Sequence, residues 1–302
     1  MRKIVADLHN HSTFSDGDLS PEEIVIKAAE IGLKCFAVTD HDSILGIAAA
    51  LIAGKKNSIQ VIPGIEVTLR FRRTDFVGSL HVLLYFSETL FNNSDFIANL
   101  NKVVSLGRGA ALNRERVSSL NKIFGPQGKQ PVLKRDLTTS EISALSPNVS
   151  RRHFAMALER NHDLSSEQIT KLIGNDSPAY VPSGVDMKEL QGLIREYPVL
   201  AVLAHPAAGS FPGESHYKEV LPPLEIVEKM LPEFFELGVQ GIEIWYPGHT
   251  KEHKAYLSAL ARQHNLIVTG GSDCHDLSLR PIGQEGITEQ ELEKVLAAII
   301  AD

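Results

Sequence analysis

Short apolar runs recur along the chain, and polar residues, glycines or prolines bound each of them. The clearest runs occupy residues 4–8, 35–40, 61–65, 81–86, 199–204 and 266–269. Runs of this length are typical of strands buried on both faces of a parallel sheet. Seven such strands can be counted, and segments with helical periodicity separate them. The alternation predicts an α/β fold, a seven-stranded barrel of β/α units.

Two of the helical segments begin with a capping signal. Residues 20–23 (SPEE) form a capping box with proline at the first helical position, and apolar residues follow at helical spacing as far as Gly32. Residues 288–291 (TEQE) repeat the pattern before another periodic apolar stretch. We therefore expect a helix over 20–32 and a closing helix that covers the sheet.

The strand rhythm is lost between residues 87 and 183. The pattern predicts helices connected by polar loops, with helical periodicity at residues 113–123, 141–145 and 152–160. A helical stretch between the fourth and fifth barrel strands predicts an inserted subdomain beside the active mouth, where it would select the substrate. The expected division is 1–86 for the first part of the barrel, 87–183 for the inserted helical subdomain and 184–302 for the second part.

Composition narrows the possible classes of protein. The chain has 302 residues, 43% hydrophobic and 22% charged, which is ordinary for a globular protein. It contains no apolar run long enough to span a bilayer and no signal-peptide pattern, so we expect a cytoplasmic protein with no membrane partner. The net charge of -7 argues against binding long duplex nucleic acid but allows a small phosphorylated ligand. Its two cysteines, Cys35 and Cys274, are expected to be reduced and packed.

Imidazole and carboxylate groups stand at the ends of the apolar runs. Side chains at one end of parallel strands converge on a single mouth, and mixed nitrogen and oxygen ligands there bind divalent metals. His9 and His11 face the same side of a strand, and the turn at Gly17 returns Asp16 to them. His81 is the weakest candidate because it begins its run. The predicted ligands are His9, His11, Asp16, His41, Glu66, His81, His205, Asp273 and His275.

Nine ligands exceed what one ion uses, so the set predicts two or three divalent ions that share Glu66 and a bridging hydroxide. The imidazole content favours manganese, zinc or iron over magnesium alone. Asp40 is expected to orient His41 from behind. A hydroxide held beside metals that also bind a phosphoryl oxygen can hydrolyse a phosphoester, with the hydroxide as the catalytic group.

The order of these motifs resembles that of the PHP (polymerase and histidinol phosphatase) superfamily. The matching segments are 7–12 (DLHNHS), 15–17 (SDG), 39–42 (TDHD), 63–66 (PGIE), 204–206 (AHP) and 271–275 (GSDCH). The resemblance implies a distorted seven-stranded, TIM-like β/α barrel with a metal cluster at its C-terminal mouth. It further implies one metal at His9, His11, Glu66 and Asp273, a second at Asp16, His41 and His205, and a third at His81 and His275.

Residues 151–155 (RRHFA) and 178–182 (PAYVP) resemble the branch of that superfamily that acts on nucleotides. The resemblance implies phosphate release from AMP or a nucleoside 3',5'-bisphosphate. A 5'-3' exonuclease acting on short RNA or DNA and a histidinol-phosphate-type phosphatase are the alternatives. Cys274 stands where relatives often carry phenylalanine, and alternation points its thiol away from the ligands. The loop over 207–227 is long for the family, so the substrate stays open.

Cationic side chains in the inserted segment are candidates for holding the substrate phosphate. Arg116 and Arg152 are the better candidates and Arg114 is a third, although a solvated helical face explains any one of them equally well. His153 could protonate the leaving group or simply pack. Two competing functions are an amidohydrolase, which would bridge its metals through a carboxylated lysine, and a non-catalytic metal-binding scaffold. The position of Glu66 disfavours the first, and the full ligand set disfavours the second.

Overall fold

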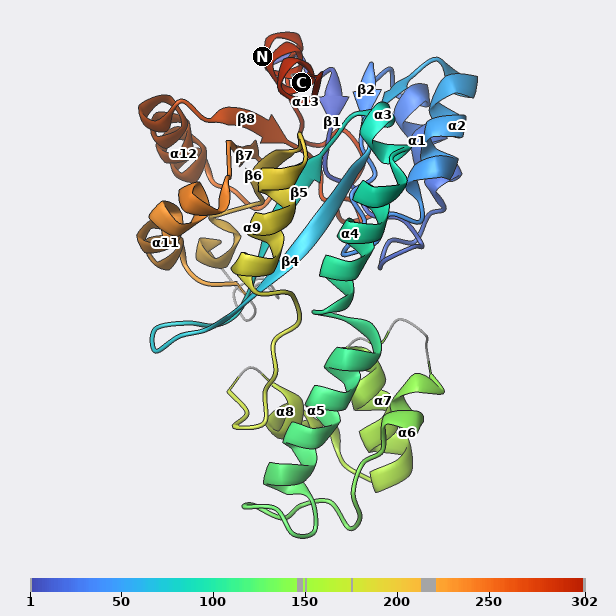
Figure 1. The fold of residues 1–302 in the computed structure, drawn as a ribbon, viewed down its shortest axis with the longest axis vertical. Coiled ribbons are helices and arrows are strands. Elements are labelled where there is room, and N and C mark those ends of the chain that lie inside the picture. The colour runs from blue at the N-terminus through green and yellow to red at the C-terminus, as the bar shows by residue number, and fades with distance from the viewer. Residues whose placement is uncertain (1, 146–148, 150, 175, 213–220, 301–302) are drawn as a thin grey trace.

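The computed structural model describes residues 2–145, 149, 151–174, 176–212 and 221–300, without the side chain of Arg152. Its strands form two sheets (Figure 1). The first is parallel and contains β1 (Ala6–Asp7), β2 (Cys35–Phe36) and β3 (Gln60–Val61). The second has the order β4 (Gly64–Arg72), β5 (Val77–Tyr85), β6 (Leu200–Leu203), β7 (Gly241–Trp245) and β8 (Ile267–Gly270). The predicted α/β class is confirmed.

The predicted single barrel differs from this arrangement in two respects. The strands belong to sheets of three and five members rather than one closed ring of seven. In addition, β5 runs antiparallel to both β4 and β6, whereas all strands were expected to be parallel. The two sheets nevertheless approach each other at both edges. Leu8 N donates to Gly270 O at 3.2 Å, and His41 forms an isolated bridge with Glu66.

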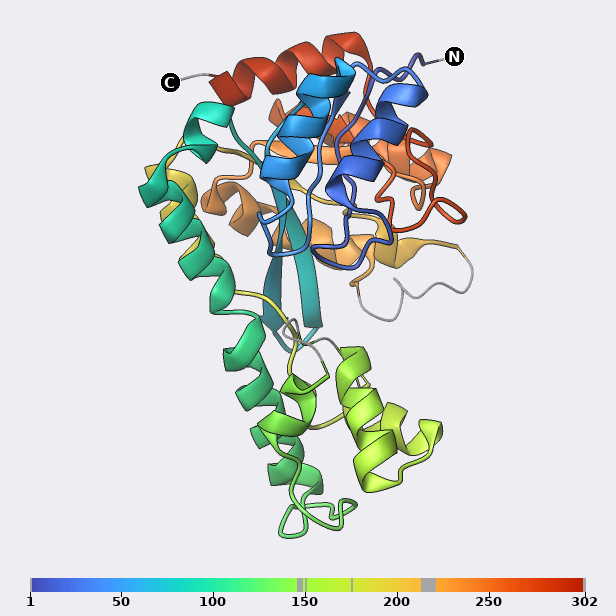
Figure 2. The same cartoon turned by 90° about the vertical axis from the view of Figure 1, so that its right-hand side faces the viewer.

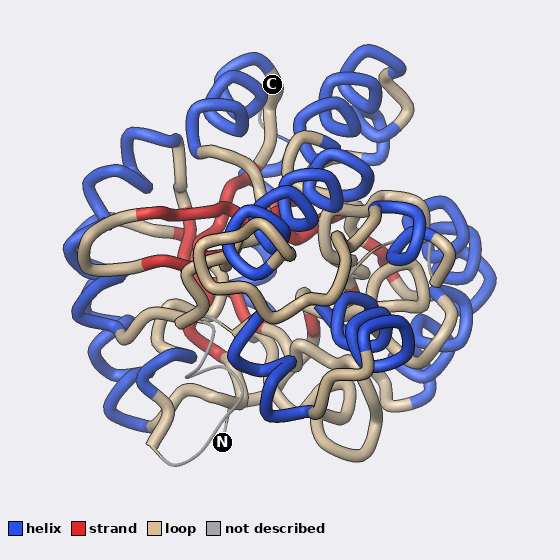
Figure 3. The backbone as a smooth tube through the Cα atoms, turned by 90° about the horizontal axis from the view of Figure 1, so that it is seen from below, coloured by secondary structure: helices blue, strands red, loops and turns tan. Residues whose placement is uncertain are grey.

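Helices surround the strands, which lie in the middle of the molecule when seen along its long axis (Figure 3). They are α1 (Pro21–Glu30), α2 (Ile47–Asn57), α3 (Glu88–Phe91), α4 (Ser94–Ser105), α9 (Met187–Glu196), α11 (Leu224–Leu237), α12 (Lys251–His264) and α13 (Glu289–Ile300), with a short 3-10 turn at Ala208–Ser210. None of the described helices is long and apolar enough to cross a membrane. The capping box at Ser20 and the closing helix after Thr288 are both confirmed.

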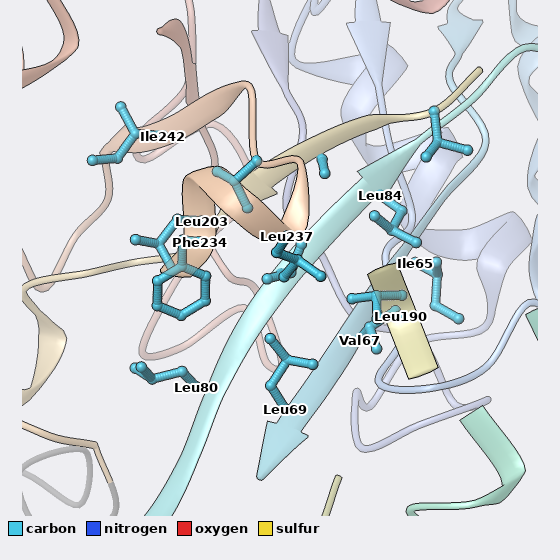
Figure 4. Packing of buried hydrophobic residues seen from close by; sticks show 14 of the residues in the cluster. Ile65, Val67, Leu69, Leu80, Leu84, Leu190, Leu203, Phe234, Leu237 and Ile242 are labelled. Atoms are coloured by element: carbon cyan, nitrogen blue, oxygen red, sulfur yellow. The ribbon is translucent and has the colours of Figure 1, made fainter. Parts of the chain in front are cut away.

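Alternation along β4 and β5 divides the core into two layers. Ile65, Val67 and Leu69 face the helices that cover the outside of the larger sheet, where they meet Leu190 of α9 and Phe234 of α11 (Figure 4). The other face of the same strands packs inward on the three-stranded sheet beneath α13, in a second cluster that includes Leu8, Leu83, Tyr85 and Val295. Because strand side chains alternate, Glu66 and Thr68, which lie between these three residues, point toward this interior.

The helices α5 (Gly109–Phe124), α6 (Thr139–Ser143), α7 (Arg151–His162) and α8 (Ser166–Ile173) form a separate lobe below the sheets (Figures 1 and 2). Helices α5 and α7 cover the predicted segments 113–123 and 152–160, and α6 overlaps the predicted segment 141–145 but ends at Ser143. The lobe has its own hydrophobic cluster, with Leu120, Phe124 and Phe154 among its members. Helix α4 precedes the lobe but packs Phe96 and Leu100 into the sheet cluster.

The chain enters and leaves the lobe through a glycine contact. Gly184 N donates to Gly107 O at 3.1 Å, and Val185 N donates to Thr68 O at 2.9 Å. Gly184 has a φ of +107°, and a Cβ there would lie 2.5 Å from the carbonyl oxygen of Thr68. Glycine is required at this position both by the backbone angle and by the close approach.

Substitution of Gly184 by alanine should therefore destabilise the protein by about 1–3 kcal/mol, because the added Cβ meets backbone in a strained conformation. Gly192, inside α9, has nothing within 4 Å of its Cβ position and is the matched control. Gly192→Ala should raise stability by about 0.5–1 kcal/mol. Urea unfolding of both variants checks the prediction, and equal stability of Gly184→Ala and the parent would contradict it.

Candidate metal centre

The structure brings all nine predicted ligands into one region, as four overlapping groups. Within each group, one ligand atom per residue lies within 4.8 Å of the others. The groups are His11, Asp16, His41 and His275; His9, His11 and Asp273; His9, Glu66 and His205; and His41, Glu66 and His81. Four residues belong to two groups each, so neighbouring groups share ligands.

Glu66 lies at the middle of this arrangement, and its side chain is 1% exposed. It occupies β4 between Ile65 and Val67, so it points inward while they point at the outer helices. Five imidazole nitrogens lie 2.9–3.3 Å from its two oxygens. They are Nε2 of His9, Nε2 of His11 and Nδ1 of His41 around Oε2, with Nδ1 of His81 and Nε2 of His205 around Oε1.

Several of these buried atoms have no hydrogen-bond partner among the described residues. They are His9 Nε2, His11 Nε2, His41 Nδ1, Glu66 Oε2 and His205 Nδ1. The ring nitrogens of His9, His11 and His41 are close to Glu66 Oε2, yet the angles are not those of hydrogen bonds. An unsatisfied buried polar group costs about 1–3 kcal/mol. Divalent cations would satisfy these nitrogen and oxygen atoms together, so the residues present fit a metal cluster.

The charges of the centre are strongly coupled. Burial alone would raise the pKa of Glu66, but the imidazoles of His41 and His81 outweigh that effect and hold the pKa well below its ordinary value. Burial acts to lower the pKa of His11, whereas its contacts with Asp273 and Glu66 raise it to about 10. The carboxylates therefore hold positive charge beside them, and a bound cation would replace the imidazole protons in that role.

Asp16 is the most solvent-exposed of the nine ligands, with 57% of its side chain accessible. It lies 3.3 Å from His275 Nε2 and 3.7 Å from His11 Nδ1. Its loop is held by Asp40, whose carboxylate accepts hydrogen bonds from Ser12 N at 2.6 Å and Ser15 Oγ at 2.6 Å. Asp40 thus anchors the loop that carries Asp16 instead of orienting His41, as had been expected.

The distances group the ligands differently from the sets that the family resemblance implied. His205 lies beside Glu66 and His81 rather than with Asp16, and His275 lies beside Asp16 and His11 rather than with His81. The antiparallel direction of β5 explains why His81 reaches the centre although it precedes most of its apolar run. Residue 81 pairs with Thr68 of β4, two residues from Glu66.

Three charged side chains of the centre were not identified from the sequence. Glu243 on β7 is fully buried and contacts His9 and His205. Asp7 is also fully buried and accepts hydrogen bonds from Ser272 N at 3.0 Å and Gly283 N at 2.8 Å. Arg280 pairs with Asp273. A charged residue inside an apolar run, as in 241–245 (GIEIW), is the signal that could have revealed Glu243.

The predicted phosphate-binding residues lie in the lobe, and the structure gives them different surroundings. Arg114 is exposed on α5, and the side chain of Arg152 lies outside the described residues. Arg116 donates from Nε to Val181 O at 3.0 Å and lines an apolar pocket with Arg151, Phe154 and Tyr180. His153 is half-buried at the start of α7.

Another arginine, Arg108, occupies the N-cap position of α5 and forms an ion pair with Asp42, directly after His41 of the metal centre. Burial lowers the pKa of Arg116 to about 10. The positive charges of Arg151 and Arg108 contribute to this lowering, so these three guanidinium groups act on one another. Mutually repelling cations of this kind favour an anion between them.

Both cysteines pack, as expected. Cys35 and Cys274 are buried, and burial raises the pKa of each thiol to about 12. The Cys274 thiol lies 3.6 Å from the carbonyl oxygen of Asp276 and belongs to a hydrophobic cluster with Ile24 and Val25.

With this geometry established, comparison with known proteins identifies the family. The sequence profile of the PHP domain family matches residues 7–175. The chain belongs to the PHP domain family.

Curated relatives align with nearly the whole chain. A phosphoribosyl 1,2-cyclic phosphate 1,2-diphosphodiesterase of Eggerthella lenta is 27% identical, over 90% of this chain and 94% of its own. A 5'-3' exoribonuclease of Haemophilus influenzae is 29% identical, over 89% of each chain. A 3',5'-nucleoside bisphosphate phosphatase of Chromobacterium violaceum is 26% identical, over 89% of this chain and 86% of its own.

Solved structures share the fold. A structure from Bifidobacterium adolescentis, assigned there to the metal-dependent phosphoesterases, superposes with a TM-score of 0.68 and 23% identity, covering 98% of this chain and 96% of that one. A Chromobacterium violaceum structure named as an amidohydrolase gives a TM-score of 0.67 and 23% identity, covering 97% and 96%. At this identity the two superpositions show the fold alone.

His249 lies behind the centre as a neutral hydrogen-bonding link. Its Nδ1 lies 2.9 Å from Ile244 O, and its Nε2 accepts from Ala207 N at 3.2 Å. One ring nitrogen therefore donates and the other accepts, which only the uncharged ring can do. Burial lowers the pKa of His249 to about 3, well below its ordinary value of 6.5.

This depressed pKa predicts acid sensitivity. The stabilisation by neutral His249 is complete above pH 6.5 and is lost as the pH falls below it, because the unfolded chain binds the proton first. The free energy of unfolding should therefore fall by about 2 kcal/mol between pH 6.5 and pH 5 because of His249. Urea unfolding at both pH values should show a smaller acid loss for His249→Gln than for the parent. Identical losses would contradict the assignment.

Proposed function

We propose that this PHP-family protein is a metal-dependent phosphoesterase that releases phosphate from a nucleotide, AMP or a nucleoside 3',5'-bisphosphate. The observation that carries the proposal is the gathering of nine nitrogen and oxygen ligands around one buried carboxylate, Glu66, with ring nitrogens that lack hydrogen-bond partners. The curated relatives, each named for action on a phosphodiester, an RNA or a bisphosphate, support the same reaction class.

In this proposal the nine residues hold two or three ions of manganese, zinc or iron. When bound, such ions act as Lewis acids on a phosphoryl oxygen and lower the pKa of water. The protein fixes the ligands from behind. Asp7 and Asp40 tie the ligand loops to neighbouring strands through hydrogen bonds to Ser272 and Ser12. The two sheets act together as a barrel-like support.

The lobe contributes the substrate contacts. We assign residues 87–183 to a substrate-selecting insertion and residues 1–86 and 184–302 to the metal-binding support. The pocket between α5, α7 and α8 offers Tyr180 and Phe154 for a base, with Arg116 and Arg151 for a phosphate. Arg108 continues this positive charge toward the metal centre. A small phosphorylated substrate can therefore bridge the lobe and the ligands.

A 5'-3' exonuclease acting on short oligonucleotides is the second candidate, favoured by the relative from Haemophilus influenzae. It would use the same metal centre and differ in how far the substrate extends across the lobe. An amidohydrolase is disfavoured because Glu66, rather than a lysine, occupies the middle of the ligands.

Removal of one ligand should abolish activity. Asp273→Asn and His41→Ala should each lower kcat/KM by at least about 100-fold for an aryl phosphate with added manganese, because each loses a metal contact. His264→Ala is the control, since His264 is exposed and lies outside the cluster. Full turnover by either ligand variant would refute a catalytic role for the centre.

Phosphate release from AMP, a 3',5'-bisphosphate and a 5'-phosphorylated trinucleotide by the parent protein then ranks the three substrates.

Substrate contact by the lobe is tested on α5. Arg116→Gln should lower kcat/KM for the preferred nucleotide by about 10–100-fold, because a hydrogen bond to a charged phosphate contributes about 1.5–3 kcal/mol. Arg114→Gln, two residues away and exposed, should change it less than about twofold. Aryl phosphate hydrolysis serves as the internal reference for an intact metal centre. Equal effects of the two variants would exclude Arg116 from the substrate site.

A further inference from the structure

Glu243 is a buried carboxylate that contributes to none of the four ligand groups found among the described residues. It lies on β7, in the middle of the apolar run Gly241–Trp245, with no exposed surface. A carboxylate in such a place is costly unless hydrogen bonds stabilise its charge. Two of the groups that hydrogen-bond to Glu243 belong to candidate metal ligands, which follow different strands.

The first partner is the ring of His9. Its Nδ1 lies 3.0 Å from Glu243 Oε1 and 3.2 Å from Oε2. The opposite nitrogen, Nε2, lies 3.3 Å from Glu66 and 3.5 Å from Asp273. An ionised carboxylate only accepts hydrogen bonds, so the proton of a neutral His9 ring must be on Nδ1. The lone pair of Nε2 then faces the other ligands.

The second partner is the backbone of His205. Its N–H donates to Glu243 Oε2 at 2.8 Å. His205 has a φ of +27°, in a region that a residue with a side chain rarely occupies. The irregular register of β7 between Glu243 and Trp245 is a feature that often re-aims side chains next to functional sites. Glu243 thus holds His205 in a strained conformation that directs its ring to Glu66, 3.1 Å away.

We propose that Glu243 is a positioning residue of the metal centre. It selects the Nδ1-protonated form of His9 and fixes the strained backbone of His205, so that both rings present a nitrogen to the same cation. The inference rests on the metal centre of the proposed function but not on its phosphoester substrate. A protein that binds metal and hydrolyses no phosphate ester would leave the role of Glu243 intact.

Glu243→Gln tests this role with little change of volume. The amide puts an NH2 group either beside His9 Nδ1, where it favours the wrong tautomer, or beside the His205 N–H, which then faces a donor instead of an acceptor. Zn²⁺ titration of chelator-treated protein by calorimetry should show at least one ion bound about 10–100-fold more weakly than in the parent.

Glu291→Gln is the matched control. Glu291 is partly buried and accepts a hydrogen bond from Trp245 Nε1 at 2.9 Å, at the end of the same strand, but has no contact with any of the nine ligands among the described residues. Its variant should retain the parent affinity for every ion. Parent-like Zn²⁺ binding by Glu243→Gln, or equal weakening in both variants, would overturn the proposal.

A measurement on the parent protein keeps the inference testable if Glu243→Gln does not fold. Long-range ¹H–¹⁵N spectra of histidine-labelled protein report which ring nitrogen carries the proton. His9, assigned by the signal missing in His9→Gln, should be protonated at Nδ1 in the Zn²⁺-loaded form, with Nε2 showing the shift of a metal-bound nitrogen. A His9 ring protonated at Nε2 would overturn the proposal.

Discussion

The arrangement of the molecule depends on one buried carboxylate. Glu66 is almost inaccessible to water, and a charge in that position costs several kcal/mol unless opposite charges or hydrogen bonds surround it. Five imidazoles from four separate segments of the chain provide that surrounding. Each must be delivered to within about 3 Å, the contact distance of hydrogen-bonding or metal-bound atoms. His9, His11, His41 and His205 follow the ends of strands, whereas Glu66 and His81 lie within β4 and β5.

Three further buried carboxylates hold those segments together. Asp7 connects the first strand to the 271–275 loop, Asp40 connects the second strand to the loop that carries Asp16, and Glu243 connects β7 to His9 and His205. Each accepts hydrogen bonds from backbone N–H groups, which fixes main chain as well as side chains. The ligand loops are thereby tied to rigid strands, as a preorganised site requires. The helical lobe, attached through Gly107 and Gly184, is built separately and carries its own core.

Much of this could be predicted where the determining signal is local. The capping box at Ser20 and the periodicity of residues 113–123 specify helices from adjacent residues alone. The ligand candidates could be found because histidines and acids stand at the ends of apolar runs. The direction of β5 could not be predicted in this way, because the apolar run that begins at His81 is the same whether the strand is parallel or antiparallel. Only the pairing of β5 with β4 and β6 decides its direction. The grouping of ligands and the role of Asp40 depend on contacts between distant segments, which spacing does not encode.

Anomalous diffraction from crystals grown with manganese tests the central claim most directly. The account predicts anomalous peaks between Glu66 and the imidazoles of His9, His11, His41, His81 and His205, within about 2–2.5 Å of the ligand atoms. Peaks confined to the protein surface, with the ligand cluster unchanged and without metal density, would contradict it.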